Sequence, residues 1–553
     1  MHILVSERPA RRPTGRPAGR ARTTVALLLV GAIPVMFVAI LFALPVIALA
    51  VRAFGHGGGG DLLDLLDGAG AWHLVAFTVE QAALSAVVTL AVSLPIIWLV
   101  VRAGPTVRRI VMVGVTVPFV LPTVVVGMAF RALLGDGGPL SLLGLDGTIG
   151  ALLCAHAFLN VAVVVRVVSA VLLSLDTRAA EAARTLGASA PRAFLTVVVP
   201  RLMPAVASAM ALVFLFCSTS FGVVLILGNG RLQTIETEIY RQAVDYFDIP
   251  TAVALTLLQV VLVAAVALLT MPWRADRAVA VGRRGRRPAS AATRVGLTLA
   301  AAWAVVVCLL PVAVLVVRSV RPTTGGQWTL VGYRMLTAQV NGQSAVSSLR
   351  YSLETALGAM VLSVIVGVAA AVGISRAPRV VGAFGGVLVV LPLGVSAVTV
   401  GFGYLIVLSN APDSIATSAA VIPCVQALIC IPVVYRMVAP ALAAVPQNLR
   451  DSAATLGAGP LRLWWTVDLP IASRAITSAA GFAFIMAVGE FGATSFLTRP
   501  GTVTLPVLIG AALGRPGEEN LAAAMAASVL LVVITGAGIA VIEMFCRDGE
   551  AGI

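Results

Sequence analysis

Two short polar segments, each lying between long apolar stretches, carry the residues best placed to act on another molecule. Residues 181–205 and 451–475, laid over one another without a gap, share ten identities in twenty-five positions. Each segment begins with an acid, Glu181 or Asp451, and small side chains follow. A leading carboxylate can pair with an arginine or lysine of a partner, and small side chains allow close approach. The two segments therefore predict a repeated docking surface rather than a reaction centre.

The composition of the first segment predicts a short helix. Residues 178–186 are good helix formers without Pro or Gly, and Gly187 suits the end of the helix. A simple amphipathic connector on the bilayer is the alternative, but a connector would be free to diverge between the two copies. The residues expected to form the docking surface are Glu181, Ala182, Ala183, Gly187, Asp451, Ser452, Ala453 and Gly457.

The rest of the sequence shows none of the residue patterns expected of a catalytic site. All 38 basic residues are arginine, and a phosphate-binding P-loop needs a lysine that reaches the β- and γ-phosphates. The six cysteines show neither metal-site spacing nor a disulfide framework. No cluster of His, Asp and Glu marks the site of a membrane-embedded enzyme. We therefore predict no catalytic residues, no metal site and no cofactor, and any ATP hydrolysis must occur in another polypeptide.

The composition of the chain favours a membrane protein. The 553 residues are 59% hydrophobic and 11% charged, whereas a soluble protein carries about 25% charged residues. Apolar runs long enough to cross a bilayer, about 20 residues each, recur along the sequence. Basic residues concentrate in the N-terminal tail and in a few short loops, which suits orientation in a membrane better than nucleic-acid binding. The expected fold is an all-α polytopic membrane protein.

The apolar runs form two sets of six. They lie near residues 25–51, 76–101, 108–131, 148–175, 200–228 and 251–272, and again near 295–317, 350–374, 380–409, 416–437, 472–498 and 521–545. Matched pairs at offsets of 274 or 270 residues include Glu80 and Glu354, Gly127 and Gly401, Arg166 and Arg436, and Phe221 and Phe491. Because each set has an even number of spans, both sets begin on the same side of the membrane. The sequence thus predicts two parallel six-helix repeats with about 12 transmembrane helices.

Loop charges set the orientation of these spans. Arginines concentrate in 102–109 and 273–294, whereas 53–75 and 132–147 are richer in aspartate. The positive-inside rule then places both docking segments and both termini in the cytoplasm.

The chain divides accordingly into four parts. These are a disordered basic tail (1–24), a first transmembrane domain (25–272), a cytoplasmic arginine-rich linker (273–294) and a second transmembrane domain (295–545).

The docking segments resemble a known motif. Glu181-Ala-Ala, three residues, Gly187 and a later Val199-Pro200 look like the cytoplasmic EAA loop of permeases in binding-protein-dependent ABC importers. In that family the loop forms a coupling helix that docks in a groove of the ATPase subunit. The second copy departs from the motif at Asp451 and Ser452, which keep the charge and the small size. If the two contacts differ in strength, we expect the contact at Glu181 to be the stronger.

Two such loops in one chain of twelve spans are similar to the fused permeases of the ferric-iron and thiamine importers. The resemblance covers the chain after residue 24 and implies the type I ABC importer permease fold. It also implies an ABC ATPase subunit, working as a dimer, and an extracytoplasmic solute-binding protein as partners, together with membrane lipid but no nucleic acid. The expected place is the bacterial cytoplasmic membrane, as a multi-pass protein. Residues 234–240 look most like the thiamine-type members, whereas the general layout fits the iron-type members equally well.

Polar residues inside the spans are costly in lipid and therefore mark function by default. The candidates for a translocation path are His156, Asn160, Ser220, Gln426 and Glu490. The alternative is that these side chains form hydrogen bonds between helices. Glu490 is the best candidate for a role in the path.

Two further alternatives stay open. A secondary carrier also has six-plus-six parallel helices, although residues 102–109 show no Gly-x-x-x-Asp-Arg-type loop. The carboxylates and tyrosines of residues 229–250 suit ferric iron as hard ligands. A docking surface or a solvated outer loop is the favoured interpretation of that stretch.

Overall fold

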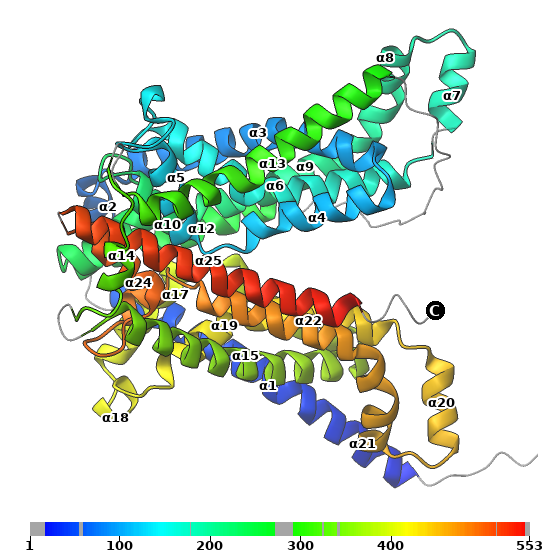
Figure 1. Ribbon diagram of the computed structural model, residues 1–553. Helices are drawn as coiled ribbons and strands as arrows, with labels where there is room; N and C mark the ends of the chain where they lie inside the picture. The colour runs from blue at the N-terminus through cyan, green and yellow to red at the C-terminus, as the bar shows by residue number, and fades with distance from the viewer. Residues whose placement is uncertain are drawn as a thin grey trace, which may run out of the picture.

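The computed structural model describes residues 17–54, 59–176, 178–270, 291–322, 326–339, 343–515 and 517–547. Within these ranges the chain is helical and contains no β-strand. The long helices form two arms that meet at one end, the joined end, and separate toward the other (Figure 1). Residues 1–16 of the expected tail and 271–290 of the expected linker lie outside the described residues, and the first helix begins at Pro17, ahead of the start expected at residue 25.

The helices of the two repeats follow one another in matching order. The first repeat contains α1 (Pro17–Phe54), α2 (Gly59–Gly68), α3 (Ala71–Arg102), α4 (Pro105–Val120), α5 (Thr123–Leu134), α6 (Ile149–Ser174), α7 (Arg178–Thr185), α8 (Ala190–Ala193), α9 (Val199–Ser218), α10 (Gly222–Leu227), α11 (Ile235–Tyr240) and α12 (Ile249–Thr270). The second contains α13 (Ala291–Val320), α14 (Val331–Met335), α15 (Ala345–Arg376), α16 (Arg379–Val390), α17 (Ala397–Ser409), α18 (Asp413–Ala416), α19 (Val421–Ala443), α20 (Gln447–Thr455), α21 (Pro460–Leu463), α22 (Leu469–Val488), α23 (Thr494–Leu497), α24 (Leu505–Leu513) and α25 (Glu518–Arg547).

Ten of the described helices are long and apolar enough to cross a membrane, and up to twelve if each of two bent pairs counts as one span. The bent pairs correct the expectation of straight helices over 108–131 and 380–409. The axis turns by 99° between α4 and α5 and by 93° between α16 and α17. Leu121 lies in extended backbone (φ −65°, ψ 139°) directly before Pro122, and a residue that precedes proline is disfavoured in the helical conformation. The same change of direction occurs in both repeats.

Two other spans lie earlier in the sequence than predicted, over Ala190–Ser218 and Pro460–Val488. The run 200–228 ends its continuous helix at Ser218, and the run 472–498 ends its helix at Val488. In each repeat the chain then turns at a Phe-Gly pair before the next short helix. A side chain at Gly222 would place its Cβ 2.4 Å from Thr123 Oγ1, so this turn needs glycine to pack against the start of α5.

The first helix of each repeat packs against the other repeat. Tyr404 Oη of α17 donates to the carbonyl of Leu41 in α1 at 2.7 Å, and a Cβ at Gly403 would lie 2.6 Å from Pro45 Cβ. In the opposite direction, Trp303 Nε1 of α13 donates to the carbonyl of Val92 in α3 at 3.0 Å. The two repeats are therefore interlocked, and each arm contains helices from both repeats.

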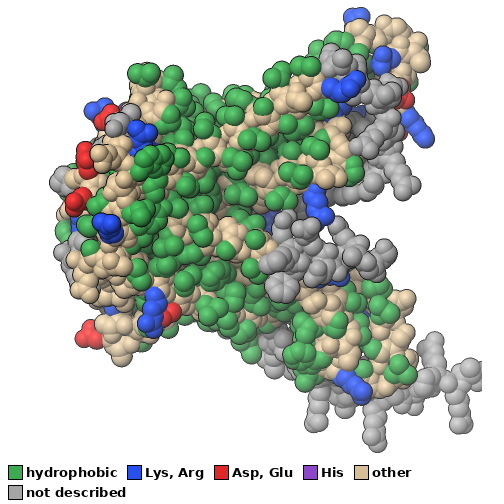
Figure 2. Space-filling view, in the orientation of Figure 1, with side chains coloured by type: hydrophobic (Ala, Val, Ile, Leu, Met, Phe, Trp, Pro, Cys, Tyr) green, Lys and Arg blue, Asp and Glu red, His purple; other side chains and the backbone are tan. Residues whose placement is uncertain are grey.

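The surface shows where lipid would lie. In Figure 2, apolar side chains cover the sides of both arms, and charged side chains gather toward the two ends. Ile33 and Ile47 of α1 are exposed, as are Leu299 and Val305 of α13. Large apolar side chains facing outward along a spanning helix are stable in hydrocarbon but not in water. The fold is that of an all-α polytopic membrane protein.

Candidate functional site

The first docking segment stands at the tip of one arm. Its helix α7 ends at Thr185, and Gly187 follows with a φ of +91°. The amide of Ala188 bonds back to the carbonyl of Ala183 at 3.0 Å, which is the closing bond of a glycine-terminated helix. Ser189 then starts α8 by accepting a hydrogen bond from the amide of Arg192. The predicted helix, its glycine end and the turn after it are all present.

The second docking segment has the same construction at the tip of the other arm. Gly457 has a φ of +81°, and the amide of Ala458 bonds to the carbonyl of Ala453 at 3.0 Å. The pattern of exposed and half-buried positions is identical over 181–190 and 451–460. The acids Glu181 and Asp451 are both exposed. The repeat thus extends from sequence to backbone geometry and exposure.

An exposed leucine ends each docking helix. Leu186 is 89% exposed and Leu456 is 87% exposed. Among the described residues, no neighbour covers either leucine. Each leucine forms, with the small exposed residues beside it, an apolar and sterically open surface. Covering such a side chain with the apolar surface of a partner removes it from water, which favours docking at this position.

The two docking segments face the open side of the molecule. In Figure 1, α7 and α8 lie at the tip of one arm and α20 and α21 at the tip of the other, with the joined end opposite them. The space-filling view shows a hollow between the arms on this side (Figure 2). A partner that contacts both tips could therefore change the distance between the arms.

A buried ion-pair cluster supports only the second segment. Asp468, whose side chain is 1% exposed, accepts from Arg450 Nε of α20 at 2.8 Å and from Arg376 Nη2 of α15 at 2.5 Å. Arg450 also donates to the carbonyl of Leu442 at 2.9 Å. These bonds tie α20 to the ends of α15 and α19 and to the turn before α22. Sequence reasoning missed the cluster, although an acid at the foot of a span, where the first repeat has Val198, could have pointed to it.

The predicted path residues of the first repeat form one buried network. His156 of α6 lies between Ser85 and Ser220, with its Nδ1 2.9 Å from one hydroxyl and its Nε2 2.9 Å from the other. The side chain of Asn160 donates to the carbonyl of His156 at 3.0 Å. The structure brings these three predicted residues together and links α3, α6 and the turn after α9.

The counterparts in the second repeat also bond internally. Gln426 Nε2 donates to the carbonyl of Ala487 at 3.0 Å. The carboxylate of Glu490 accepts from the amides of Ala493 and Thr494 at 2.7 and 2.9 Å. Such bonds fit the alternative that these side chains connect helices and stabilise turns. A role in the path stays a prediction for all five residues.

The middle of the stretch 229–250 is buried rather than solvated, which corrects part of the sequence-based interpretation, whereas Tyr246 and Phe247 near its end are exposed. Its helix α11 is buried, and Glu236 and Glu238 are 0% and 3% exposed. Glu238 accepts from Gln242 Nε2 at 2.7 Å and pairs with Arg241 at 3.5 Å. The prediction failed at Glu236 because its hydrogen-bond partners, Gln259 and Ser396, lie outside this stretch of the sequence.

Comparison with known proteins agrees with this geometry. Residues 82–323 match the family described as binding-protein-dependent transport system inner membrane component. A molybdenum transport system permease protein of Azotobacter vinelandii is 30% identical over 184 residues, which cover 31% of this chain and 81% of that protein. The chain belongs to this permease family.

Two further relatives match nearly the whole permease. A thiamine transport system permease protein of Brucella abortus (strain 2308) is 26% identical over 524 residues, covering 91% of this chain and 92% of the relative. A protein of the same description from Escherichia coli (strain K12) is 24% identical over 478 residues, covering 84% and 87%. Both matches extend through the two repeats, which supports the expectation of a fused permease.

Proposed function

We propose that this permease is the membrane subunit of an ATP-driven importer that passes thiamine from a binding protein to the cytoplasm. The observation that carries the proposal is the pair of matched, exposed docking segments at the arm tips of a chain whose full-length relatives are named for thiamine transport. These relatives favour thiamine over ferric iron, the other solute that the sequence allowed.

The docking segments would receive an ATPase dimer, one subunit at each arm. Their exposed leucines, Leu186 and Leu456, would enter apolar grooves, and Glu181 and Asp451 would pair with basic residues of the partner. Since the chain has no lysine, it contains no P-loop of its own. Closure of the ATPase dimer would draw the arm tips together, and the arms would separate at the joined end.

The charge distribution supports a cytoplasmic position for the docking segments. In Figure 2, most of the visible acidic side chains lie toward the joined end, although the docking acids Glu181 and Asp451 lie at the arm tips. Both docking segments carry arginines, among them Arg184 and Arg462. The positive-inside rule then places the tips in the cytoplasm and the joined end toward the binding protein. By the same rule, both termini would lie in the cytoplasm.

A secondary carrier is the alternative function. A carrier driven by protons or other ions would need titratable side chains along the path of the ion, and it would not need a docking surface for an ATPase. The exposure of both docking segments and the membership of a binding-protein-dependent family favour the importer.

The test is reconstitution of the permease with a candidate ATPase and binding protein in liposomes. We expect uptake of labelled thiamine that requires ATP on the side of the bilayer where the ATPase is bound. Exchange of Glu181 and Asp451 for lysine in one double variant should abolish ATPase association and uptake, whereas exchange of the exposed Glu354 of α15 for lysine should not. Full uptake by the double variant, or uptake that a protonophore collapses while ATP is intact, would favour the carrier.

A further inference from the structure

A carboxyl group lies buried where the two repeats meet. Glu236 of α11 is 0% exposed, and its carboxylate accepts from Gln259 Nε2 of α12 at 2.8 Å. Its second oxygen accepts from Ser396 Oγ, at the start of α17, at 2.6 Å. Ser396 belongs to the second repeat, so this carboxylate bridges the boundary between the repeats.

The second repeat builds the corresponding structure without any of these polar groups. Glu236 and Gln259 match Pro506 and Val529, which lie 270 residues later. Ser396 matches Pro122, which lies 274 residues earlier. Ser396 and Pro122 both directly precede a helix, α17 and α5.

The remaining support of the two short helices is shared. The first amide of α11, at Ile235, donates to Thr78 Oγ1 at 3.2 Å, and the first amide of α24, at Leu505, donates to Ser352 Oγ at 2.7 Å. The fold therefore forms this helix, in the same place, with proline instead of glutamate. Because burying a carboxyl group is unfavourable even when it is hydrogen-bonded, Glu236 indicates a role beyond folding.

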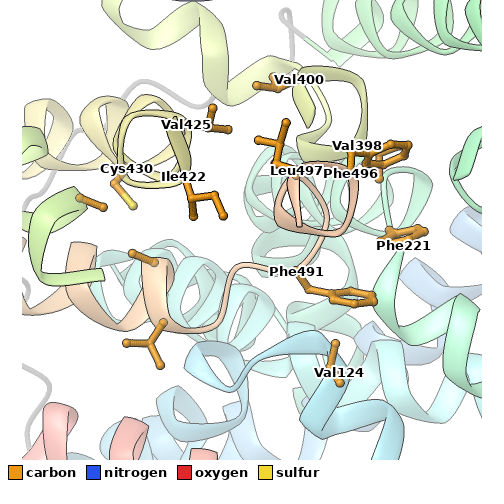
Figure 3. Packing of buried hydrophobic residues seen from close by; sticks show 14 of the residues in the cluster. Val124, Phe221, Val398, Val400, Ile422, Val425, Cys430, Phe491, Phe496 and Leu497 are labelled. Carbon is orange, nitrogen blue, oxygen red and sulfur yellow. The ribbon is translucent and has the colours of Figure 1, made fainter. Parts of the chain in front are cut away.

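A continuous chain of aromatic rings accompanies Glu236. Tyr240, one helical turn after Glu236, lies with its ring 5.3 Å from Phe221 and 5.5 Å from Phe496. Phe221 stacks on Phe491 with a centroid distance of 5.1 Å and an interplanar angle of 20°. Figure 3 shows Phe221, Phe491 and Phe496 near one another in the packed interior.

This ring chain crosses between the repeats. Phe221 and Phe491 occupy matched positions, so their stack joins equivalent points of the two repeats. Tyr240 has no ring at its own matched position, which is Gly510. Both the extra ring and the carboxylate therefore belong to the first repeat.

We propose that Glu236, with the ring faces of Phe221 and Phe491, forms a transit site for an aromatic cation when the repeats separate. Moving the repeats apart at this point would break the contact between Glu236 and Ser396 and unstack the two phenylalanines together. One negative charge and two aromatic faces would then become available to the same solute. Cations bind to aromatic faces and to carboxylates in poorly solvated sites.

The inference rests on the proposed function, since thiamine is a cation with aromatic rings. It adds the residues by which the permease would favour such a solute over an anion. Anionic solutes would meet the unfavourable field of Glu236 at the same point.

The test uses the complete importer in liposomes, with labelled thiamine as the probe and uptake per ATP hydrolysed as the readout. Glu236→Gln keeps the size of the side chain and its ability to bond with Ser396 and Gln259, but removes the charge. We expect about a tenfold loss of uptake per ATP, with ATPase stimulation by the loaded binding protein retained. Glu236→Asp should restore a substantial part of the uptake. Glu238→Gln removes a neighbouring buried charge on the same helix and, as the matched control, should leave uptake per ATP within about twofold of the wild type.

Each other result counts against the inference. Full uptake per ATP by Glu236→Gln, or equal losses in Glu236→Gln and Glu236→Asp, would overturn the role of the charge and leave thiamine as the solute. A Glu236→Gln permease that no longer assembles would show that the fold needs this carboxyl group, and would overturn the argument from Pro506. Stimulated ATPase activity without thiamine uptake in the wild type would overturn the proposed solute and this inference with it.

Discussion

The two docking segments have the same outer surface but different support from the helices behind them. On the second arm, Asp468 holds Arg450 of α20 and Arg376 of α15 in one buried cluster. On the first arm, the matched positions of Asp468 and Arg450 are Val198 and Ala180, which cannot form ion pairs. The partner would thus meet two similar helices, and within the described part of the chain only α20 is tied by ion pairs to its transmembrane bundle.

This difference suggests a division between recognition and force transmission. Recognition depends on exposed residues, and those positions agree in the two copies. Transmission of movement depends on how firmly each helix is joined to the spans, and there the copies differ. The sequence-based expectation that the Glu181 contact is the stronger concerns the first property only. The experiments below separate the two properties.

The largest effect is expected from Asp468→Asn. Removing the charge would leave Arg376 and Arg450 without their shared partner, at a cost of about 3 kcal/mol in stability, the lower end for breaking a buried pair. Since both arginine side chains are 22% exposed, water can compensate in part. Hydrogen exchange measured by mass spectrometry should show faster exchange across α20, whereas α7 should not change.

The matched control for this variant is Val198→Asn, at the equivalent position of the first arm. It should leave exchange in both docking helices close to that of the wild type. Unchanged exchange across α20 in Asp468→Asn would show that the ion pairs do not hold that helix, and the comparison between the arms would fail.

A smaller effect is expected from shortening the exposed leucines. Leu186→Ala and Leu456→Ala should each weaken binding of the ATPase by about 2 kcal/mol, because an apolar side chain is buried on docking. The thermal stability of the isolated permease should stay the same, since both side chains are almost fully exposed. Titration of the purified permease with its ATPase would measure both losses.

Leu142→Ala is the control for the leucine variants. Leu142 is 99% exposed but lies on the connection between α5 and α6, away from the arm tips. A loss of affinity confined to one of the two docking leucines would show that the arms dock differently in recognition as well as in support.

The smallest effect is expected at the glycines that end the docking helices. Gly187→Ala and Gly457→Ala force a side chain into left-handed backbone, which costs about 1 kcal/mol. No heavy atom lies within 4 Å of the added Cβ at either position, so the cost comes from the backbone alone. Both variants should weaken ATPase binding slightly and equally, as measured by the same titration.

Gly144→Ala provides the control for this backbone cost. Gly144 has a φ of +59° and equally open surroundings, but it lies outside the docking segments. It should leave ATPase binding unchanged, and a loss as large as that of Gly187→Ala would mean that the titration reports general destabilisation.

Local features were predictable from the sequence. The docking helices depend on helix-forming residues and one glycine each, so residues 178–187 contain the information for their own conformation. The polytopic class follows from composition because lipid accepts long apolar helices with satisfied backbones. The bends after α4 and α16 were missed because hydropathy averages over such breaks, although Pro122 marks the first of them.

Contacts between residues far apart in the chain could not be predicted from the sequence. The burial of Glu236 depends on Gln259 and on Ser396, which lies 160 residues away. A charge count over the same residues therefore indicated a solvated loop. Likewise, nothing in the pattern of α1 states that it packs against α17 rather than against its own repeat.

The sequence by itself determined the membrane environment, the duplication and the two docking helices, because hydropathy, repeat spacing and helix ends depend on neighbouring residues. The tertiary structure alone decided which helices of the two repeats touch, that Asp468 supports only one docking helix, and that Glu236 lies at the boundary between the repeats. The physical reason is that lipid and protein interior are similarly apolar. Hydrophobicity can therefore place a helix in the membrane without selecting its neighbours, which are fixed by side-chain packing and by a few buried polar contacts.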